Sequence, residues 1–489
     1  MKNLFGFGTA AALGLLACVG ASSLPGATST MTLDQDASSE ELPEFMRNMV
    51  AVCYAEGAPS DVVEAVETGL YGLGQRFFTT GRWPGSVGEP VNLTYSFPPD
   101  GLNIPASGGI PGEVSEPNVI HDRLNTIFAS QGGEVFWKDL FRQTFDAWSA
   151  VTGNTYTEVP DDGASWGAAP GSPDRGDIRI AMKGIDGFGG VLAYNFFPSG
   201  GGNMVLDRAE NWGASAANFR FLRNTVMHEH GHGLGLLHSC PGSGQTGGNT
   251  RLMQPTIATN FDGPQQDDIR GAHSLYGDAL SPINSIATAL DLNDLGLTVN
   301  VPFVINNTLS LRNFNDTDNF RVDAPPSSRL SVTVTPIGTT YLNGPQNSNG
   351  TCSAGTPLDA LRQQDLRIQI LSPSGSVITT VDQNGLGEPE MLESFNLGVE
   401  GVYTVRIGSS NSDGNVQRYN LSITLEPDGV LGDLNGDNCV GSADLSILLG
   451  SWGPCPAPPN ACIADLTGNG SVGSADLSTL LGNWGGECN

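Results

Sequence analysis

At 489 residues the chain is too long for one ordinary hydrophobic core, and its length predicts roughly three domains. Its 22 lysines and arginines stand against 51 aspartates and glutamates, which gives a formal net charge of −29. That balance argues against nucleic-acid binding, which needs basic surface, and suits a soluble extracellular protein whose carboxylates can also hold calcium.

Residues 1–21 have the pattern of a secretory signal peptide. Lys2 precedes the apolar stretch Leu4–Gly20, and small residues follow at a place that suits cleavage before Ser22. Cys18 stands in a weak version of a lipoprotein box, so attachment at the cell surface is the alternative to release. No later segment has the ~18 to 20 consecutive apolar residues of a membrane span. We therefore expect a secreted, extracellular protein.

Of the eight cysteines, seven remain if Cys18 is removed with the signal peptide. They are Cys53, Cys240, Cys352, Cys439, Cys455, Cys462 and Cys488. Disulfides are expected among the last four, because an exported protein folds in an oxidising compartment. An odd number leaves one thiol unpaired or in an intermolecular bond, and the sequence does not fix the connectivity.

Residues 22–82 are interpreted as a prosegment or an N-terminal extension, with helices expected near Glu41–Tyr54 and Ser60–Leu73. In the next segment, residues 83–280, strands and helices alternate. Apolar and polar residues alternate along Val91–Phe97, which predicts a half-buried strand.

The same segment contains a second predicted strand, Asp177–Met182, and between the two strands a helix that ends near Gly153. Three aromatic residues lie at helical spacing on that helix: Phe141, Phe145 and Trp148.

The segment after residue 225 reads VMHEHGHGLGLLH and contains an HExxH pattern followed by a glycine and a third histidine. Residues four apart on a helix share a face, so His228 and His232 can direct both imidazoles at one ion. Gly235 lets the chain leave the helix, and the turn brings in His238 as a third zinc ligand.

Three neutral imidazoles leave one coordination position for water, whose pKa zinc lowers toward ~7. Glu229, next to the first ligand, is the expected general base, so the predicted chemistry is Glu-assisted attack of zinc-bound water on a peptide bond. His230 lies roughly 200° around the helix from the first ligand and is treated as a non-ligand. His121 and His273 carry no motif, and structural roles are expected for them.

The extended motif resembles that of the metzincin metallopeptidases, and its neighbours narrow the resemblance to the matrixin type, the family of the matrix metalloproteinases. Residues 252–255 look like the family's Met-turn, which places Met253 beneath the zinc ligands. Residues 267–277 are similar to the closing helix of the catalytic domain, and residues 186–193 to the loop and edge strand that bind substrate. The implied substrate-binding strand comprises Gly190, Val191, Leu192 and Ala193. The resemblance covers residues 83–277 and implies an α+β domain, a mixed β-sheet with a zinc helix.

The resemblance also implies calcium ligands, because Asp186, Asp207 and Glu210 match the family's positions. The family's second, structural zinc is not implied, since Tyr194 and Val205 stand where its histidines would be expected. We therefore predict one catalytic zinc, together with calcium.

Matrixins often keep latency through a cysteine in a Pro-Arg-Cys-Gly context, whereas Cys53 stands between Val52 and Tyr54. One interpretation makes its thiolate a zinc ligand in a latent form. The favoured alternative is a disulfide or an unpaired structural thiol.

Residues 282–427 consist of short alternating runs between clusters of Gly, Pro, Asn and Ser, which predicts an all-β sandwich. The clearest runs are Leu330–Val334, Leu366–Ile370, Tyr403–Ile407 and Tyr419–Ile423. Together with Asp316–Val322, the last two runs resemble the prepeptidase C-terminal domain of secreted bacterial peptidases. That resemblance implies substrate or matrix binding or, with equal weight, a spacer.

Residues 428–489 contain a duplication, since Val440–Gly453 and Val472–Gly485 are nearly identical. Each half places oxygen-bearing residues at positions 1, 3, 5 and 12 of a calcium loop, and an apolar helix follows. The first loop has Asp433, Asn435, Asp437 and Asp444, and the second has Asp465, Thr467, Asn469 and Asp476. The pattern resembles a dockerin, a small α-helical module of paired calcium loops that docks onto cohesin domains, and so implies a cohesin-like partner. The insertion with Cys455 and Cys462 departs from the usual linker.

The expected function is that of a secreted zinc-dependent metalloendopeptidase that hydrolyses extracellular proteins. The alternative is an inactive metzincin-like binding or scaffold protein anchored through the dockerin-like tail. The presence of Glu229 favours the enzyme. An exopeptidase or a narrow processing enzyme is a third hypothesis, but an open edge strand favours internal cleavage.

Overall fold

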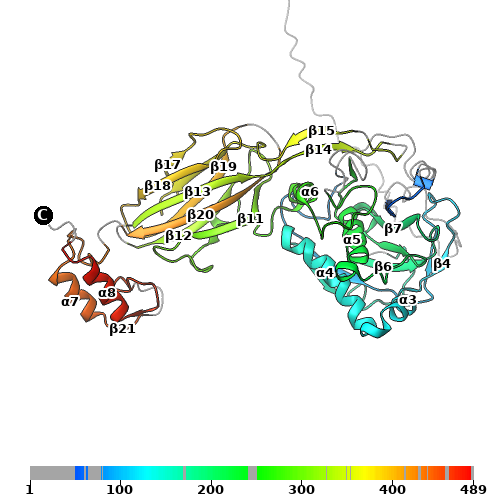
Figure 1. The fold of residues 1–489 in the computed structure, drawn as a ribbon, viewed down its shortest axis with the longest axis horizontal. Coiled ribbons are helices and arrows are strands. Elements are labelled where there is room, and N and C mark those ends of the chain that lie inside the picture. The colour runs from blue at the N-terminus through cyan, green and yellow to red at the C-terminus, as the bar shows by residue number, and fades with distance from the viewer. Residues whose placement is uncertain are drawn as a thin grey trace, which may run out of the picture. The chain divides into compact units, whose positions relative to one another are not determined.

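The computed structural model describes most of the chain after residue 49, and Figure 1 shows these parts as coloured ribbons. The described residues are 50–59, 62–63, 66, 79, 81–168, 172–240, 251–325, 328–347, 350–352, 354–411, 415–427, 431–437, 439–456 and 462–485. The predicted signal peptide, the first part of the predicted extension and Cys488 lie outside them. Within these residues, no helix combines the length and the apolar character that a bilayer crossing requires.

The first region is built on a six-stranded mixed sheet with the order β1-β7-β8-β6-β2-β5. The strands are β1 (Val50–Tyr54), β2 (Asn92–Ser96), β5 (Thr155–Glu158), β6 (Ile178–Lys183), β7 (Val191–Phe196) and β8 (Met204–Asp207). Strands β5, β2, β6 and β8 pair in parallel, whereas β7 is antiparallel to β8 and β1 is antiparallel to β7. A separate two-stranded ladder joins β3 (Asn103–Ile104) to β4 (Glu116–Pro117).

Helices accompany this sheet, and among them α5 packs against both α4 and β7 (Figure 1). The helices are α3 (Ile120–Ile127), α4 (Glu134–Thr152), α5 (Ala216–Gly233) and α6 (Gln266–Tyr276), and short 3₁₀ turns span Ala129–Gln131 and Pro198–Gly200. As predicted, α4 buries its aromatic face and ends at Gly153, whose φ of 71° is a left-handed conformation that glycine adopts without steric cost. The region is thus a mixed α+β fold, as the sequence indicated.

The extension differs from its prediction. Val50–Tyr54, the end of the first expected helix, is strand β1, and all five of its residues are buried. Val50, Val52 and Tyr54 are β-branched or aromatic residues that alternate along the chain, a pattern that fits a strand paired on a sheet. Of the second expected helix, Val62, Val63 and Val66 are helical, and most of the rest lies outside the described residues.

The second region is β-rich and has two sheets that share one hydrophobic core. The five-stranded sheet has the order β10-β12-β19-β16-β17, and the four-stranded sheet has the order β11-β20-β13-β18. Their strands are β10 (Leu290–Asp291), β11 (Phe303–Leu311), β12 (Asp318–Ala324), β13 (Ser328–Ile337), β16 (Leu366–Leu371), β17 (Val377–Val381), β18 (Glu390–Asn396), β19 (Gly401–Ser409) and β20 (Gln417–Pro427), and a 3₁₀ turn spans Ile286–Thr288. The alternating runs predicted from the sequence lie on β13, β16, β19 and β20.

A hairpin inserted between β13 and β16 pairs with the first region. It consists of β14 (Thr340–Pro345) and β15 (Thr356–Asp359), and the residues between them carry Cys352. Strand β14 also pairs with β9 (Ser239–Cys240), a two-residue strand directly after the third histidine. We call residues 340–359 the arm.

The tail contains the helices α7 (Ser442–Gly450) and α8 (Ser474–Gly482) and the two-stranded ladder of β21 (Gly453–Pro454) with β22 (Ser471–Val472). Corresponding residues of the two repeats, Val440 with Val472 and Leu448 with Leu480, are buried in one small core. The two repeats in the sequence therefore contribute equivalent buried side chains to one shared core.

Candidate metal centre and active site

Helix α5 and the turn after it bring three imidazoles together. His228 and His232 are fully buried, and His238 is 2% exposed. Their Nε2 atoms are 3.1 Å apart between His228 and His232, and each lies 3.2 Å from Nε2 of His238. A tetrahedral zinc with bonds of about 2.0–2.1 Å needs ligand nitrogens about 3.3–3.4 Å apart, so the three residues fit this ion.

Each of the three rings has a hydrogen-bond acceptor on its other nitrogen. His228 Nδ1 lies 2.7 Å from the carbonyl oxygen of Leu252, and His232 Nδ1 lies 2.7 Å from that of Leu236. His238 Nδ1 lies 2.6 Å from the side-chain oxygen of Gln346. Acceptors at Nδ1 fix the tautomer with its proton there and leave the Nε2 lone pairs for a metal. Burial also lowers the pKa of His228 to about 4, which keeps its ring neutral.

Two glycines make this arrangement sterically feasible. Gly235 has a φ of 98°, and a Cβ there would overlap the carbonyl oxygen of Gly81, so only glycine fits the turn that returns His238 to the site. A Cβ on Gly231 would overlap the sulfur of Met253, which therefore lies against the zinc helix. The sequence predicted both the turn and the place of Met253.

Glu229 lies in the same buried space. Neither of its carboxylate oxygens has a hydrogen-bond partner among the described residues. Burial raises the pKa of this carboxyl well above its usual range, although the nearby backbone amide of Cys53 opposes the shift. A buried carboxylate without partners is costly, which is consistent with a site shaped for a cation and a water molecule.

Strand β1 lies beside these residues, an arrangement that the sequence did not predict. It pairs along β7, with Val52 opposite Tyr194 and Cys53 opposite Ala193. On its other side, the Tyr54 carbonyl accepts a hydrogen bond of 3.0 Å from Ile257 N. The expected substrate strand, from Gly190 to Ala193, is therefore not an open edge here.

Cys53 is the free cysteine among the described residues and is fully buried. Its sulfur, a ring nitrogen of His228 and a carboxylate oxygen of Glu229 all lie within 4.8 Å of one another. The disulfide alternative for this residue is thus wrong, and the thiol lies beside the metal site. Burial raises the pKa of the thiol well above its usual range, and the charge of Glu229 adds a smaller increase.

Asp268 is a residue of the site that sequence reasoning missed. Its carboxylate accepts hydrogen bonds from the backbone N–H groups of Leu252 (2.6 Å), Met253 (2.9 Å) and Gln265 (2.7 Å). It thereby joins the start of α6 to the turn beneath the zinc ligands. A local signal existed, because Gln265 and Asp268 form a capping box at the start of α6.

The predicted calcium ligands of this region come together from two places, the loop between β6 and β7 and the end of β8. Asp207 Oδ2 accepts N–H groups from Asp186 (3.1 Å) and Gly187 (2.9 Å), and Glu210 Oε1 accepts that of Gly189 (2.7 Å). Burial raises the pKa values of Asp186 and Glu210, and the charge of Asp207 adds to both shifts. A cation there would relieve this repulsion.

Tyr194 and Val205, which replace the family's structural-zinc histidines, lie opposite each other on β7 and β8 and are buried. Lys183 Nζ and Glu113 Oε1 form a fully buried ion pair of 2.6 Å. The charge of Glu113 adds to the effect of burial in raising the pKa of Tyr194.

The other histidines have partners away from the triad. His230 Nε2 lies 2.8 Å from the hydroxyl of Tyr156, and His273 Nε2 lies 2.8 Å from the carbonyl oxygen of Val151. His121 lies 3.7 Å from Glu134. Structural roles were predicted for His121 and His273, and His230 was predicted to be a non-ligand.

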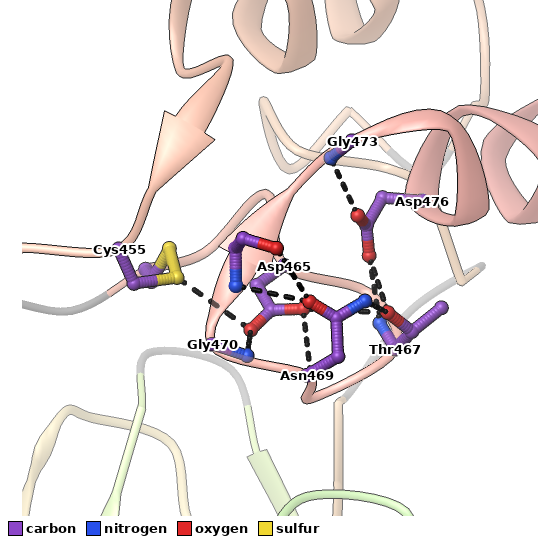
Figure 2. The surroundings of a disulfide bond; sticks show 9 residues. Cys455, Asp465, Thr467, Asn469, Gly470, Gly473 and Asp476 are labelled. Carbon is purple, nitrogen blue, oxygen red and sulfur yellow. Dashed lines mark hydrogen bonds between the residues drawn. A yellow bond between two sulfur atoms is a disulfide. The ribbon is translucent and has the colours of Figure 1, made fainter.

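In the tail the structure gathers both sets of predicted loop residues. Asp433, Asp437 and Asp444 have carboxylate oxygens within 4.8 Å of one another. In the second loop, the Thr467 hydroxyl donates to Asp476 (2.8 Å), and Asn469 Nδ2 donates to the Thr467 hydroxyl (2.8 Å), as Figure 2 shows.

The cysteines of the insertion, Cys455 and Cys462, form a disulfide next to the second loop. The Cys455 sulfur lies 3.5 Å from Asp465 Oδ2, at the start of that loop (Figure 2). Cys439 is also disulfide-bonded.

Comparison with known proteins agrees with this geometry. Residues 130–277 match the model of the matrixin family. The chain is 38% identical to the hatching enzyme of Paracentrotus lividus over 144 residues, which are 29% of this chain and 22% of that enzyme. It is 30% identical to the neutrophil collagenase of Homo sapiens over 192 residues, which are 37% of this chain and 38% of the collagenase. Over 147 residues, 29% of each chain, it is 35% identical to the interstitial collagenase of Equus caballus.

Residues 130–277 thus form a domain of matrixin type. The chain spans between about a fifth and two-fifths of the length of these curated relatives, from 22% to 38%.

Proposed function

We propose that residues 83–280 are a zinc-dependent endopeptidase domain in which His228, His232 and His238 hold the ion and Glu229 is the general base. The observation that carries this proposal is the convergence of three Nε2 atoms, 3.1–3.2 Å apart, beside the buried Glu229 carboxylate, whose oxygens have no hydrogen-bond partner among the described residues. The matrixin match over residues 130–277 supports the same reaction class. The relatives named as collagenases support extracellular proteins as substrates.

Bound zinc would supply positive charge that polarises the scissile carbonyl and lowers the pKa of water. Glu229 takes the proton from the attacking water and delivers it to the leaving nitrogen. Substrate lies extended and pairs with β7 at Val191–Ala193 as an added strand. Met253 packs against Gly231 and so supports the zinc helix from below.

The arrangement with β1 in place is a latent form. Strand β1 uses the same edge of β7 that substrate needs, and Cys53 brings a thiol to the metal site. Activation therefore requires β1 to leave the cleft, by cleavage of the extension or by its displacement.

The remaining regions serve localisation and stability in this proposal. Calcium is held by Asp186 from the loop before β7 and by Asp207 and Glu210 from the end of β8. The sheets of residues 282–427 are a prepeptidase C-terminal-like sandwich, and residues 1–21, before the extension, are a signal peptide that directs secretion.

The tail, residues 428–489, is a dockerin-like module with two calcium loops and a cohesin-like partner. Exposed apolar side chains recur at equivalent places of the two repeats, which supports a docking surface: Leu449, Trp452, Leu481 and Trp484 are 46–53% exposed.

The test is casein cleavage by the secreted chain after limited proteolysis has released β1. Glu229→Gln keeps the size of the side chain and the metal ligands but removes the base, so the rate should fall by about 10²–10⁴. Metal analysis should find equal zinc in both proteins. Equal cleavage would refute the role of Glu229, and zinc binding without cleavage by either protein would favour the inactive scaffold.

A further inference from the structure

The third zinc ligand has a hydrogen-bond partner of a different kind from those of the other two. His228 and His232 are held by backbone carbonyls of their own region, whereas His238 is held by the side chain of Gln346, 108 residues away. Gln346 belongs to the arm, and its side chain is 3% exposed. The zinc site is therefore completed by a segment outside the matched residues 130–277.

The orientation of the Gln346 amide is fixed by its second contact. Its Nε2 donates a 2.8 Å hydrogen bond to the carbonyl oxygen of Gly350, also in the arm. The opposite end of the amide, the oxygen Oε1, must then face His238 Nδ1, where it accepts at 2.6 Å. An acceptor at Nδ1 directs Nε2 toward the metal and makes the ring a better ligand.

The arm is covalently linked to the residues that directly follow His238 in the sequence. Cys240, two residues after the ligand, is fully buried and forms a disulfide with Cys352. In the ladder, Gly344 lies opposite Cys240 and Pro345 opposite Ser239.

A buried cation links the two sides of this junction. Arg251 is 1% exposed, and its Nη1 donates to the carbonyl oxygen of Cys240 at 2.6 Å. Its Nη2 donates to the carbonyl oxygen of Leu342 on β14. The disulfide, the pairing of β9 with β14 and the Arg251 side chain all lie within a few residues of His238. Together they restrict the movement of the arm where Gln346 contacts His238.

We propose that Gln346 is the positioning residue of His238, and that the Cys240–Cys352 disulfide keeps it there, so that the arm sets the affinity of the site for zinc. This inference rests on the proposed zinc site but not on peptidase activity. Without the acceptor, His238 Nδ1–H would be left without its partner in a buried space, and the ring would lose its fixed orientation.

The test measures zinc affinity of the full chain by competition with a chromophoric chelator. Gln346→Leu keeps the approximate size but removes the acceptor, and zinc binding should weaken about 10- to 100-fold. Gln346→Glu retains an acceptor oxygen and should restore most of the affinity. Thr356→Val removes a polar group elsewhere on the arm, a hydroxyl that donates a 3.3 Å hydrogen bond to the Asn343 carbonyl oxygen, and should leave zinc affinity unchanged.

A second pair of variants tests the covalent link. Cys240→Ser with Cys352→Ser should weaken zinc binding, but by less than Gln346→Leu does, because the ladder and Arg251 remain. Unchanged zinc affinity in this double variant would overturn the role of the disulfide. Cys455→Ser with Cys462→Ser removes the disulfide of the tail and should leave zinc affinity unchanged.

Two further readings separate positioning from a loss of folding. The zinc-free Gln346→Leu chain should still unfold in one cooperative thermal transition, with a midpoint lowered by no more than the loss of one buried hydrogen-bond partner explains. The visible absorption of the Co²⁺-loaded protein should change in Gln346→Leu and return in Gln346→Glu. Zinc affinity of Gln346→Leu within about threefold of wild type would overturn the inference while leaving the proposed function intact. A wild-type chain that binds no zinc would overturn both.

Discussion

The substitution Val52→Asp should activate the unprocessed chain, because it weakens the docking of β1 without changing any group at the metal site. Val52 is fully buried and belongs to the core cluster of Val66 and Tyr194, on the face of the sheet away from zinc. Cys53, the next residue, belongs to the other cluster, with Ala193. An aspartate at position 52 therefore acts on the docking of β1 and not on the thiol.

The size of the effect follows from the cost of burying the new charge. An unpaired carboxylate in an apolar cluster costs several kcal/mol, even after its pKa rises to limit the penalty. With a loss of about 3 kcal/mol, the fraction of molecules with β1 displaced should rise roughly 100-fold, since each 1.4 kcal/mol is a factor of ten. The initial rate on substrate should rise by the same factor until the open form predominates.

The assay is the initial rate of casein cleavage by purified chain, with mass spectrometry to show that the extension is intact. Val87→Asp places the same charge at a side chain that is 54% exposed and outside β1, so its rate should equal that of wild type. Adding Glu229→Gln to Val52→Asp should abolish the gain. A Val52→Asp chain that folds, binds zinc and cleaves no faster than wild type would refute the reasoning.

Three further predictions concern other sites. Cys53→Ser should raise the activity of the unprocessed chain less than Val52→Asp does, because β1 stays paired with β7, and the same casein assay measures it. In the tail, Asp437→Asn should weaken calcium binding at the first loop roughly 10- to 30-fold, since a unit charge about 4 Å from a divalent ion contributes about 2 kcal/mol in water. Asn469→Asp should strengthen calcium binding at the second loop by a similar factor. Calorimetry measures both changes. Burial raises the pKa of Asp268 to about 7, so its contribution to stability is present in full below the unfolded pKa of about 3.9 and is lost as pH rises through about 7. The midpoint temperature of thermal unfolding should therefore fall more between pH 5 and pH 8 for the wild type than for Asp268→Asn.

Each of these predictions has a result that contradicts it. A Cys53→Ser chain as inactive as wild type would show that the thiol does not contribute to latency. Calcium heats that do not respond to either tail substitution would reject the assignment of the loops. An equal pH dependence of unfolding in wild type and Asp268→Asn would show that this carboxyl does not titrate with folding.

The parts of the site that the sequence predicted are those whose geometry is local. His228, Glu229 and His232 lie on one helix, and the turn at Gly235 brings His238 back three residues later. Spacing alone therefore places all four side chains. The proposed calcium loops of the tail are equally local, since in each loop twelve consecutive residues would supply the ligands.

The parts that the sequence did not predict depend on contacts between distant segments. The strand β1 forms only because β7 and the segment at Ile257 offer it backbone partners on both sides, and a helix was expected there because a local reading does not include them. Gln346 is one glutamine among many in a β-rich region, and nothing in its neighbours marks it as the partner of His238.

The two distant segments make opposite demands on the chain. In the proposed mechanism, strand β1 must leave for substrate to pair with β7, whereas the arm must stay for His238 to keep its orientation. The cysteines are distributed in the way these demands require: the arm is joined to the first region by Cys240–Cys352, while Cys53 on β1 is free. An oxidising compartment would therefore lock the segment that supports the metal and leave the segment that blocks the cleft removable.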